Sequence, residues 1–241
     1  LLASYNPETQ QTARKQTGSF YTPREIVQYM VDESLVTHLK RTVGNELESE
    51  YRKLLDYADN EILLTEQQKL AIMQSLYNCK ILDPACGSGA FPVGVLQQMV
   101  HILKQIDPDN SRWKNMLLQF AIDETSEAYL NSTAEERREA VADIERAFDE
   151  NVNYPDYARK LHLIENCIYG VDIQPIAIQI SKLRFFISLV IDQKRNKNPA
   201  DNFGIRPLPN LEAKFVAANS LLGLKRTEGS LFDSEEIKQK E

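Results

Sequence analysis

Cysteine, histidine and tryptophan are scarce in this sequence. Its 241 residues include three Cys, three His and one Trp. Cys79, Cys86 and Cys167 form no CxxC pair, and the His residues do not cluster with them. A disulfide framework or a structural zinc site therefore does not fit, and a reducing cytoplasm is the expected setting. We expect no bound metal.

Long apolar runs and an excess of positive charge are also lacking. No run approaches the ~18 residues of a membrane span, and no signal peptide opens the chain, so we expect no membrane partner. The formal net charge of −7 argues against a chain that coats nucleic acid by itself. The sequence begins "LLASYNPE" without Met and stops in the charged run "SEEIKQKE", which suggests a piece of a longer polypeptide.

The composition is otherwise that of a globular protein, with 42% hydrophobic and 26% charged residues. Apolar periodicity predicts a helix over 23–40, with Thr22 as its N-cap and Pro23 at the first helical position. Two helices are expected within 46–78, and further helices in the charged stretch 107–163, with Ser132 or Thr133 as a cap. Strands are expected at 80–84, 167–173 and 213–219, with helices at 89–106 and 175–192 after the first two. This alternation predicts an α/β fold with a parallel sheet.

The first strand runs into an unusual turn, "ILDPACGSGAFP". Gly87 and Gly89 allow a tight backbone turn and let a ligand approach without meeting a Cβ atom. The pattern is not the dinucleotide fingerprint, because Pro92 stands where a third Gly belongs, and no Gly-Lys-Ser/Thr of a P-loop follows. Taken alone, this turn fits an ordinary strand-to-helix connection equally well.

The second strand ends in "YGVDIQP". Asp172 can accept hydrogen bonds from both hydroxyls of a ribose, and Ile173 offers an apolar surface to a flat base. A lone Asp at a strand end is usually a helix cap or a surface residue. One strand after a Gly-rich turn, it indicates a nucleoside site.

Four separated motifs occur in order: "GSFYTPREIVQYMV", "ILDPACGSGAFPVGVL", "IYGVDIQPIAIQISKLRFFISLVI" and "NSLLG". Together they resemble the adenine-specific DNA methyltransferases of the gamma arrangement. More narrowly, they resemble the methylase portion of type IIG restriction–modification enzymes and related phage-defence methylases. The resemblance covers 18–224 apart from the charged helical stretch. It implies a Rossmann-like class I methyltransferase core with an incomplete parallel sheet, S-adenosylmethionine as cofactor, and double-stranded DNA as partner through a recognition domain of the parent chain. The expected location is the cytoplasm of a bacterium or archaeon.

The same resemblance divides the chain into three parts. Residues 1–78 form an N-terminal helical segment that carries "GSFYTP", residues 79–106 and 164–241 form the cofactor-binding core, and residues 107–163 form a helical insertion. The insertion accounts for the separation of Asp83 from Asp172, which far exceeds the ~20–30 residues of a compact βαβ unit. We expect a solvated helical excursion rather than a DNA-binding surface, since its Glu and Arg residues are balanced.

Roles for individual residues also follow from the resemblance. Thr22 and Pro23 match the motif that holds the methionine end of the cofactor, and Asp83 matches the acceptor for its ammonium group. Asp172 matches the ribose-binding acid, Ile173 the residue that packs on adenine, and Asn219 the position that meets the adenine amine. The full set of expected cofactor-binding residues is Tyr21, Thr22, Pro23, Asp83, Pro84, Ala85, Gly87, Ser88, Gly89, Phe91, Asp172, Ile173, Asn219 and Ser220.

One part of the family's machinery is missing. Adenine methylation needs an Asn-Pro-Pro-Tyr or Asn-Pro-Pro-Phe tetrapeptide to hold the flipped-out base. Asn6-Pro7 and Asn198-Pro199 lack the second Pro and the aromatic ring. No target-recognition domain is evident either. We therefore expect no catalytic residue in this chain, and weak or absent binding of S-adenosylmethionine by the chain alone.

Two alternatives stay open. The chain is a methyltransferase of protein or RNA, or it is a non-catalytic Rossmann-like binding module. The upstream "GSFYTP" favours a DNA methyltransferase, and the turn pattern disfavours a dinucleotide dehydrogenase. Phe185 and Phe186 are expected in the core, Arg184 in a contact between elements, and Cys86 as a small residue that fills the tight turn.

Overall fold

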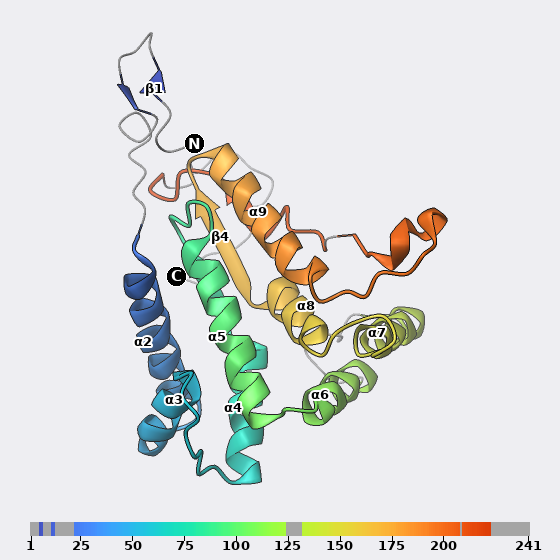
Figure 1. The fold of residues 1–241 in the computed structure, drawn as a ribbon. Helices are drawn as coiled ribbons and strands as arrows, with labels where there is room; N and C mark the ends of the chain where they lie inside the picture. The colour runs from blue at the N-terminus through green and yellow to red at the C-terminus, as the bar shows by residue number, and fades with distance from the viewer. Residues whose placement is uncertain (1–4, 7–10, 13–21, 124–131, 208, 223–241) are drawn as a thin grey trace, which may run out of the picture.

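The computed structural model describes residues 5–6, 11–12, 22–123, 132–207 and 209–222. It shows a mixed α/β protein in which helices pack against a small parallel sheet (Figure 1). The described part near the N-terminus includes a short antiparallel pair, β1 (Tyr5–Asn6) and β2 (Gln11–Thr12), which the sequence did not predict.

The parallel sheet has the order β3-β4-β5, with β3 at Ile81–Asp83, β4 at Ile168–Asp172 and β5 at Phe215–Ala217. Asp83 pairs with Gly170, and Asp172 pairs with Ala217. Each strand lies within a range predicted from the sequence, and the parallel pairing is confirmed. The carboxyl ends of the strands therefore meet at one edge of the sheet.

Helices cover one face of this sheet. They are α5 (Ala90–Ile106), α8 (Asp156–Asn166) and α9 (Pro175–Val190), each of which contacts β4. Phe185 on α9 is fully buried, and its ring centroid lies 4.9 Å from that of Phe215 on β5. The core role expected for Phe185 is confirmed.

The opposite face of the sheet is largely bare in the described part of the chain. Leu82 on β3 is 61% exposed and Val216 on β5 is 41% exposed, whereas Gly170 and Phe215 on the covered face are buried. Parallel sheets are normally buried on both faces.

The N-terminal helices are α2 (Arg24–Thr42), α3 (Glu48–Leu55) and α4 (Glu66–Asn78), with a 3-10 turn η1 at Asn45–Leu47. The predicted cap of α2 was wrong: Pro23 itself is the N-cap, and no side chain caps this helix. Helix α2 packs on α5 where Gly94 leaves room, since a Cβ atom there would lie 3.3 Å from a methyl group of Val27.

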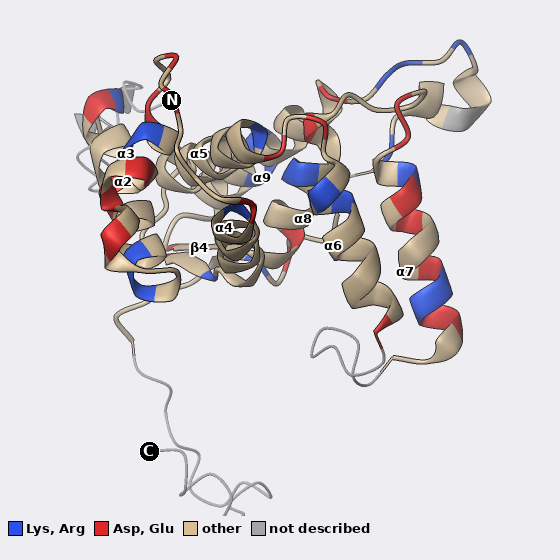
Figure 2. Ribbon diagram, turned by 90° about the horizontal axis from the view of Figure 1, so that it is seen from below, with Lys and Arg blue, Asp and Glu red and all other residues tan. Residues whose placement is uncertain are grey.

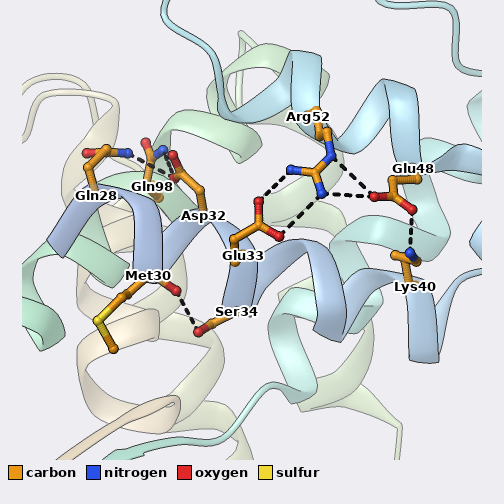
Figure 3. A network of polar contacts seen from close by, with 9 residues as sticks. All are labelled: Gln28, Met30, Asp32, Glu33, Ser34, Lys40, Glu48, Arg52 and Gln98. Carbon is orange, nitrogen blue, oxygen red and sulfur yellow. Dashed lines mark hydrogen bonds and ion pairs between the residues drawn. The ribbon is translucent and has the colours of Figure 1, made fainter. Parts of the chain in front are cut away.

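Polar contacts fasten α2 to its neighbours (Figure 3). Arg52 on α3 forms an ion pair with Glu33 on α2 at 2.6 Å and another with Glu48 at 2.9 Å. The amide of Gln28 donates to Asp32 at 2.9 Å, and the buried amide of Gln98 on α5 donates to the same carboxylate oxygen at 2.5 Å. The bond from Gln98 holds α2 alongside α5, and the ion pair between Arg52 and Glu33 holds α2 beside α3.

The charged stretch contains α6 (Ser111–Ile122) and α7 (Ala134–Ala147), and the described part of α7 carries charges of both signs (Figure 2). Thr133 caps α7 in a capping box with Glu136, which confirms one of the two predicted caps. A further 3-10 segment, η3, spans Pro199–Gly204.

The chain leaves and re-enters the core at one place. Asn110 donates its side-chain N–H to the carbonyl of Pro155 at 2.6 Å, and Arg159 on α8 donates to the carbonyl of Asp107. We call these four residues the neck. Because α8 also packs on α5 and α9, it belongs to the helical layer on the sheet, although most of it lies within the range expected as an insertion.

No helix in the ranges that the structure describes is both long enough and apolar enough to cross a membrane.

Candidate functional site

The site predicted from the sequence lies at the carboxyl edge of the sheet. β3 ends at Asp83 and leads into the turn that begins α5, and β4 ends at Asp172. The chain after β5 reaches the same place, because the hydroxyl of Ser220 donates to the carbonyl of Pro84 at 3.0 Å. Three segments that are distant in sequence therefore converge on one edge.

Gly87 and Gly89 of the turn differ in the space around them. Both have positive φ, 54° at Gly87 and 84° at Gly89. A Cβ atom at Gly89 would lie 2.5 Å from the hydroxyl oxygen of Ser181 on α9, so this glycine lets α5 begin against α9. A Cβ atom at Gly87 would meet nothing within 4 Å. The open space beside Gly87 is available to a ligand.

Asp172 ties the two strand ends together. One carboxylate oxygen accepts the backbone N–H of Gly87 at 2.8 Å, and the other accepts the N–H of Gln174 at 2.8 Å. Each oxygen of a carboxylate has two acceptor positions, so both oxygens can accept a further hydrogen bond. The sequence located Asp172 at the site but did not indicate this bond to the turn.

Asp83 has an acceptor that no protein group satisfies. One carboxylate oxygen accepts the N–H of Ala85 at 3.1 Å, while the other is buried and has no hydrogen-bond partner. Burial raises the pKa of Asp83, the bond from Ala85 lowers it, and the nearby charge of Asp172 raises it further. A buried acceptor without a donor is costly, so this oxygen suits a ligand that brings a positively charged donor.

Two further predicted residues, Ile173 and Asn219, are exposed to solvent. Ile173 follows Asp172 and is 60% exposed, so its side chain offers an apolar surface beside the carboxylate. Asn219 is exposed, and its side-chain oxygen accepts the N–H of Leu221 at 3.0 Å. Its amide nitrogen and the remaining acceptor position of its oxygen can still contact a ligand.

The other predicted residues have mixed placements. Pro84, Ala85 and Ser88 are exposed in the turn, whereas Phe91 is partly buried and packs on the core. Thr22 and Pro23 precede α2, whose first turns lie beside those of α5 at Gly94. Tyr21 lies outside the described residues.

Two contacts to the turn were not predicted as such. The hydroxyl of Ser181 donates to the carbonyl of Gly87 at 3.2 Å, and Arg184 donates to the carbonyl of Ser88 at 3.1 Å. Both side chains come from α9, three residues apart on neighbouring turns of the helix. Arg184 was expected in a contact between elements, but nothing in the local sequence marks Ser181.

The thiols near the site are not activated. Cys86 is buried, and burial together with the charges of Asp83 and Asp172 raises its pKa to about 11. Its sulfur fills the space beside Gly170, where a Cβ atom would lie 2.9 Å from it. Across the described residues, no group of three or more His, Cys, Asp or Glu side chains is placed to hold a metal ion.

Comparison with known proteins gives one informative match. The chain is 27% identical to a Methanocaldococcus jannaschii protein provisionally named as a type II restriction enzyme and methyltransferase, in an alignment 224 residues long that covers 87% of this chain. The chain spans only 15% of that relative. No family model matches the chain, and no solved structure matches it. Over most of its length, this chain is thus a distant homologue of part of a protein that is named for both restriction and methyl transfer.

Proposed function

We propose that this chain is the S-adenosylmethionine-binding part of an adenine-specific DNA methyltransferase in a restriction–modification or phage-defence system. The observation that carries the proposal is the pair of carboxylates at the ends of two adjacent strands, where one oxygen of Asp83 has no hydrogen-bond partner and the turn that follows β3 has open space at Gly87.

The site residues fit the chemistry of this cofactor. Its ammonium group supplies the charged donor that Asp83 lacks, and its ribose hydroxyls are donors for the free acceptor positions of Asp172. Its adenine ring is flat and apolar enough to pack on Ile173. A dinucleotide fits less well, because its pyrophosphate would lie close to two carboxylates.

The bound cofactor supplies the methyl group, and the residues of this chain bind and orient it. None of them is a candidate nucleophile, since burial keeps the pKa of each described thiol above its usual value. That fits transfer to an exocyclic amine, which needs positioning and a proton acceptor rather than a covalent enzyme intermediate. The Asn-Pro-Pro-aromatic motif that holds the base would come from outside this chain.

The sheet itself supports a larger Rossmann-like core. From β3 to β4 to β5 the chain moves in one direction, and its crossover helices lie on one face. Crossovers between parallel strands are right-handed, so the direction in which strands are added decides which face their helices cover. Strands added beyond the free edge of β3 would extend the sheet in the opposite direction, and their helices would cover the bare face that carries Leu82 and Val216. The order of strands would then reverse at β3, beside the turn that follows Asp83. In doubly wound folds, ligands bind at the point where the strand order reverses.

The choice of adenine in DNA as substrate has two supports, one for adenine in DNA and one for DNA alone. One is the order of the four motifs, with "GSFYTP" upstream of the Gly-rich turn. The other is the M. jannaschii relative, whose name couples restriction with methyl transfer. A methylase that is paired with a nuclease must modify the DNA that the nuclease would cut.

A binding titration with matched variants tests the cofactor site. We expect the chain to bind S-adenosylmethionine with a dissociation constant of about 100 µM or weaker, measured by calorimetry or NMR, because the bare sheet face leaves the pocket partly open. Asp83→Asn should weaken binding at least about tenfold, since the ammonium loses a charged acceptor. Asp59→Asn, at an exposed position far from the turn in sequence, is the control. Equal affinity of Asp83→Asn and the parent chain, or tighter binding of NAD, would overturn the assignment.

Product analysis tests the substrate. A polypeptide that joins this chain to its Asn-Pro-Pro-aromatic motif should convert DNA adenine to N6-methyladenine, detected by mass spectrometry of digested DNA. Methylcytosine, or methylation confined to RNA or protein, would contradict the proposal.

A further inference from the structure

The turn after β3 is held from one side by two residues of α9. The hydroxyl of Ser181 donates to the carbonyl of Gly87 at 3.2 Å, and the guanidinium of Arg184 donates to the carbonyl of Ser88 at 3.1 Å. Residues three positions apart lie on the same side of a helix. Two successive carbonyls of the turn are therefore drawn toward α9.

Ser181 is firmly placed for this contact. Its side chain is fully buried, on a helix that packs against β4, β5 and α5. Gly89 leaves room for it, since a Cβ atom on Gly89 would lie 2.5 Å from the Ser181 hydroxyl oxygen and 3.2 Å from the Ser181 Cβ atom. The hydroxyl is thus a fixed point against which the turn is oriented.

The backbone N–H groups of the turn are almost all used inside the protein. In residues 85–89, every N–H except one donates to a protein oxygen at distances from 2.8 to 3.1 Å: those of Ala85, Cys86, Gly87 and Gly89. The exception is the N–H of Ser88, which finds no acceptor in the part of the chain that the structure describes. Because Ser88 is exposed, this N–H is available to a ligand.

The bond from Ser181 decides which way this donor faces. A peptide unit is planar and trans, so the C=O of Gly87 and the N–H of Ser88 point in opposite directions. With the Gly87 carbonyl turned to Ser181, the Ser88 N–H points away from α9. Gly87 has no side chain and a φ of 54°, so the peptide that follows it could otherwise rotate at little steric cost. The Ser181 hydroxyl therefore selects one orientation of a permissive peptide.

A carboxylate is the ligand group that this donor suits. In an α-amino acid the ammonium and the carboxylate are attached to the same carbon, so a site that binds one must also accommodate the other. Asp83 and Asp172 would repel the carboxylate unless a donor faced it. The Ser88 N–H lies in the turn that joins Asp83 to α5, and the partial positive charge at the start of α5 acts in the same sense.

We propose that Ser181 is a positioning residue for the carboxylate of S-adenosylmethionine. Its hydroxyl holds the Gly87–Ser88 peptide so that the Ser88 N–H faces the cofactor's carboxylate, and Arg184 steadies the next peptide. The inference rests on the proposed function and adds to it. Asp83 recognises the ammonium of the cofactor, and the peptide held by Ser181 recognises its carboxylate.

Decarboxylated S-adenosylmethionine separates positioning from structure. This analogue keeps the adenosine, the sulfonium and an ammonium group but lacks the carboxylate. Ser181→Ala should weaken binding of S-adenosylmethionine about threefold to tenfold in an NMR titration of the chain, because one hydrogen bond to a charged group is misdirected. The same variant should bind the analogue within about twofold of the parent chain, since the analogue never makes that bond.

Three further variants sharpen the comparison. Ser188→Ala removes a hydroxyl two turns further along α9 that donates to the carbonyl of Phe185 at 2.8 Å, and it should bind both compounds like the parent chain. Ser181→Cys keeps a weak donor of similar size, so its affinity for S-adenosylmethionine should fall between those of the parent chain and Ser181→Ala. Asp83→Asn should weaken both compounds, because both carry the ammonium.

The parent chain itself supplies a direct measurement. The amide resonance of Ser88 should shift on addition of S-adenosylmethionine and shift much less with the decarboxylated analogue. Equal shifts with the two compounds would separate Ser88 from the carboxylate and overturn the inference.

The titrations can also fail in ways that distinguish the two proposals. If Ser181→Ala weakened both compounds equally, its role would be merely structural, and if it weakened neither, it would have no role. Either result overturns the positioning role and leaves the proposed function standing. If the parent chain bound neither compound, the proposed function would fall and this inference with it.

Discussion

Replacement of Asp172 by Ala should damage both the fold and the cofactor site. The carboxylate accepts two backbone N–H groups, from Gly87 and from Gln174, each at 2.8 Å. A hydrogen bond to a charged group contributes about 1.5–3 kcal/mol. Because Asp172 is partly exposed to water, the low end applies, and the two bonds together stabilise the fold by roughly 2–3 kcal/mol. At about 2–4 °C per kcal/mol for a chain of this size, the midpoint of thermal unfolding should fall by roughly 5–10 °C.

The Asn variant separates the two effects. Asp172→Asn keeps one side-chain oxygen, so the loss of thermal stability should be about half that of Asp172→Ala. It removes the charge that accepts the ribose hydroxyls, so the affinity for S-adenosylmethionine should still fall at least about tenfold. Hydrogen exchange supplies a local measurement: the Gly87 amide should exchange faster in both variants. If Asp172→Ala melted within 1 °C of the parent chain and left the exchange of Gly87 unchanged, the link between the strand ends would be refuted.

Three further outcomes are expected. Gly89→Ala should lower the free energy of unfolding by roughly 2–4 kcal/mol, because the new Cβ atom would lie 2.5 Å from Ser181 in a backbone of positive φ. Gly87→Ala has the same backbone strain but faces open space, so its free energy of unfolding should fall by only about 1–2 kcal/mol. Equal losses for the two variants in urea unfolding would contradict this. Burial lowers the pKa of His162 to about 3, so the unfolded chain binds an extra proton between that value and about 6.5, and stability should fall as the pH drops through this window; His162→Phe should lose roughly 2 kcal/mol less than the parent between pH 7 and pH 5. Replacement of all three cysteines by Ser should leave methyl transfer by the parent enzyme intact, and a trapped covalent adduct with DNA would refute the proposed direct transfer.

Local sequence patterns predicted the three parallel strands and the two acidic residues at their ends. Asp83 stands directly before Pro84, and Asp172 stands in the run Val-Asp-Ile-Gln-Pro that leads to Pro175; both strands end at these acids. The parallel sheet followed from the alternation of strands and helices. The prediction of Thr22 as a cap failed because Pro23, with an extended ψ, took the capping position itself.

The long-range contacts were not predictable in the same way. The bond from Gly87 to Asp172 and the close approach of Gly89 to Ser181 each join residues more than 80 positions apart. Such pairs depend on how helices stack on the sheet, and no local pattern encodes that stacking. Ile176, Leu183 and Ile187 of α9 are exposed, but a helix expected between strands invites a core assignment for all its apolar residues. Exposure on one side became evident only once the helical layer was in place.

The neck has a consequence for how this protein tolerates change. Residues between Asn110 and Pro155 depart from and return to one spot, where their ends are fastened by the bonds from Asn110 and Arg159. Trp113, Met116 and Leu117 of α6 and Ala147 of α7 are also buried in the core, so these parts of the stretch must stay. We expect the connection between α6 and α7 to accept shortening, lengthening or insertion of a foreign module while Asp83 and Asp172 keep their positions. A binding module inserted beyond the neck could therefore give the protein a new binding property without changing the cofactor site.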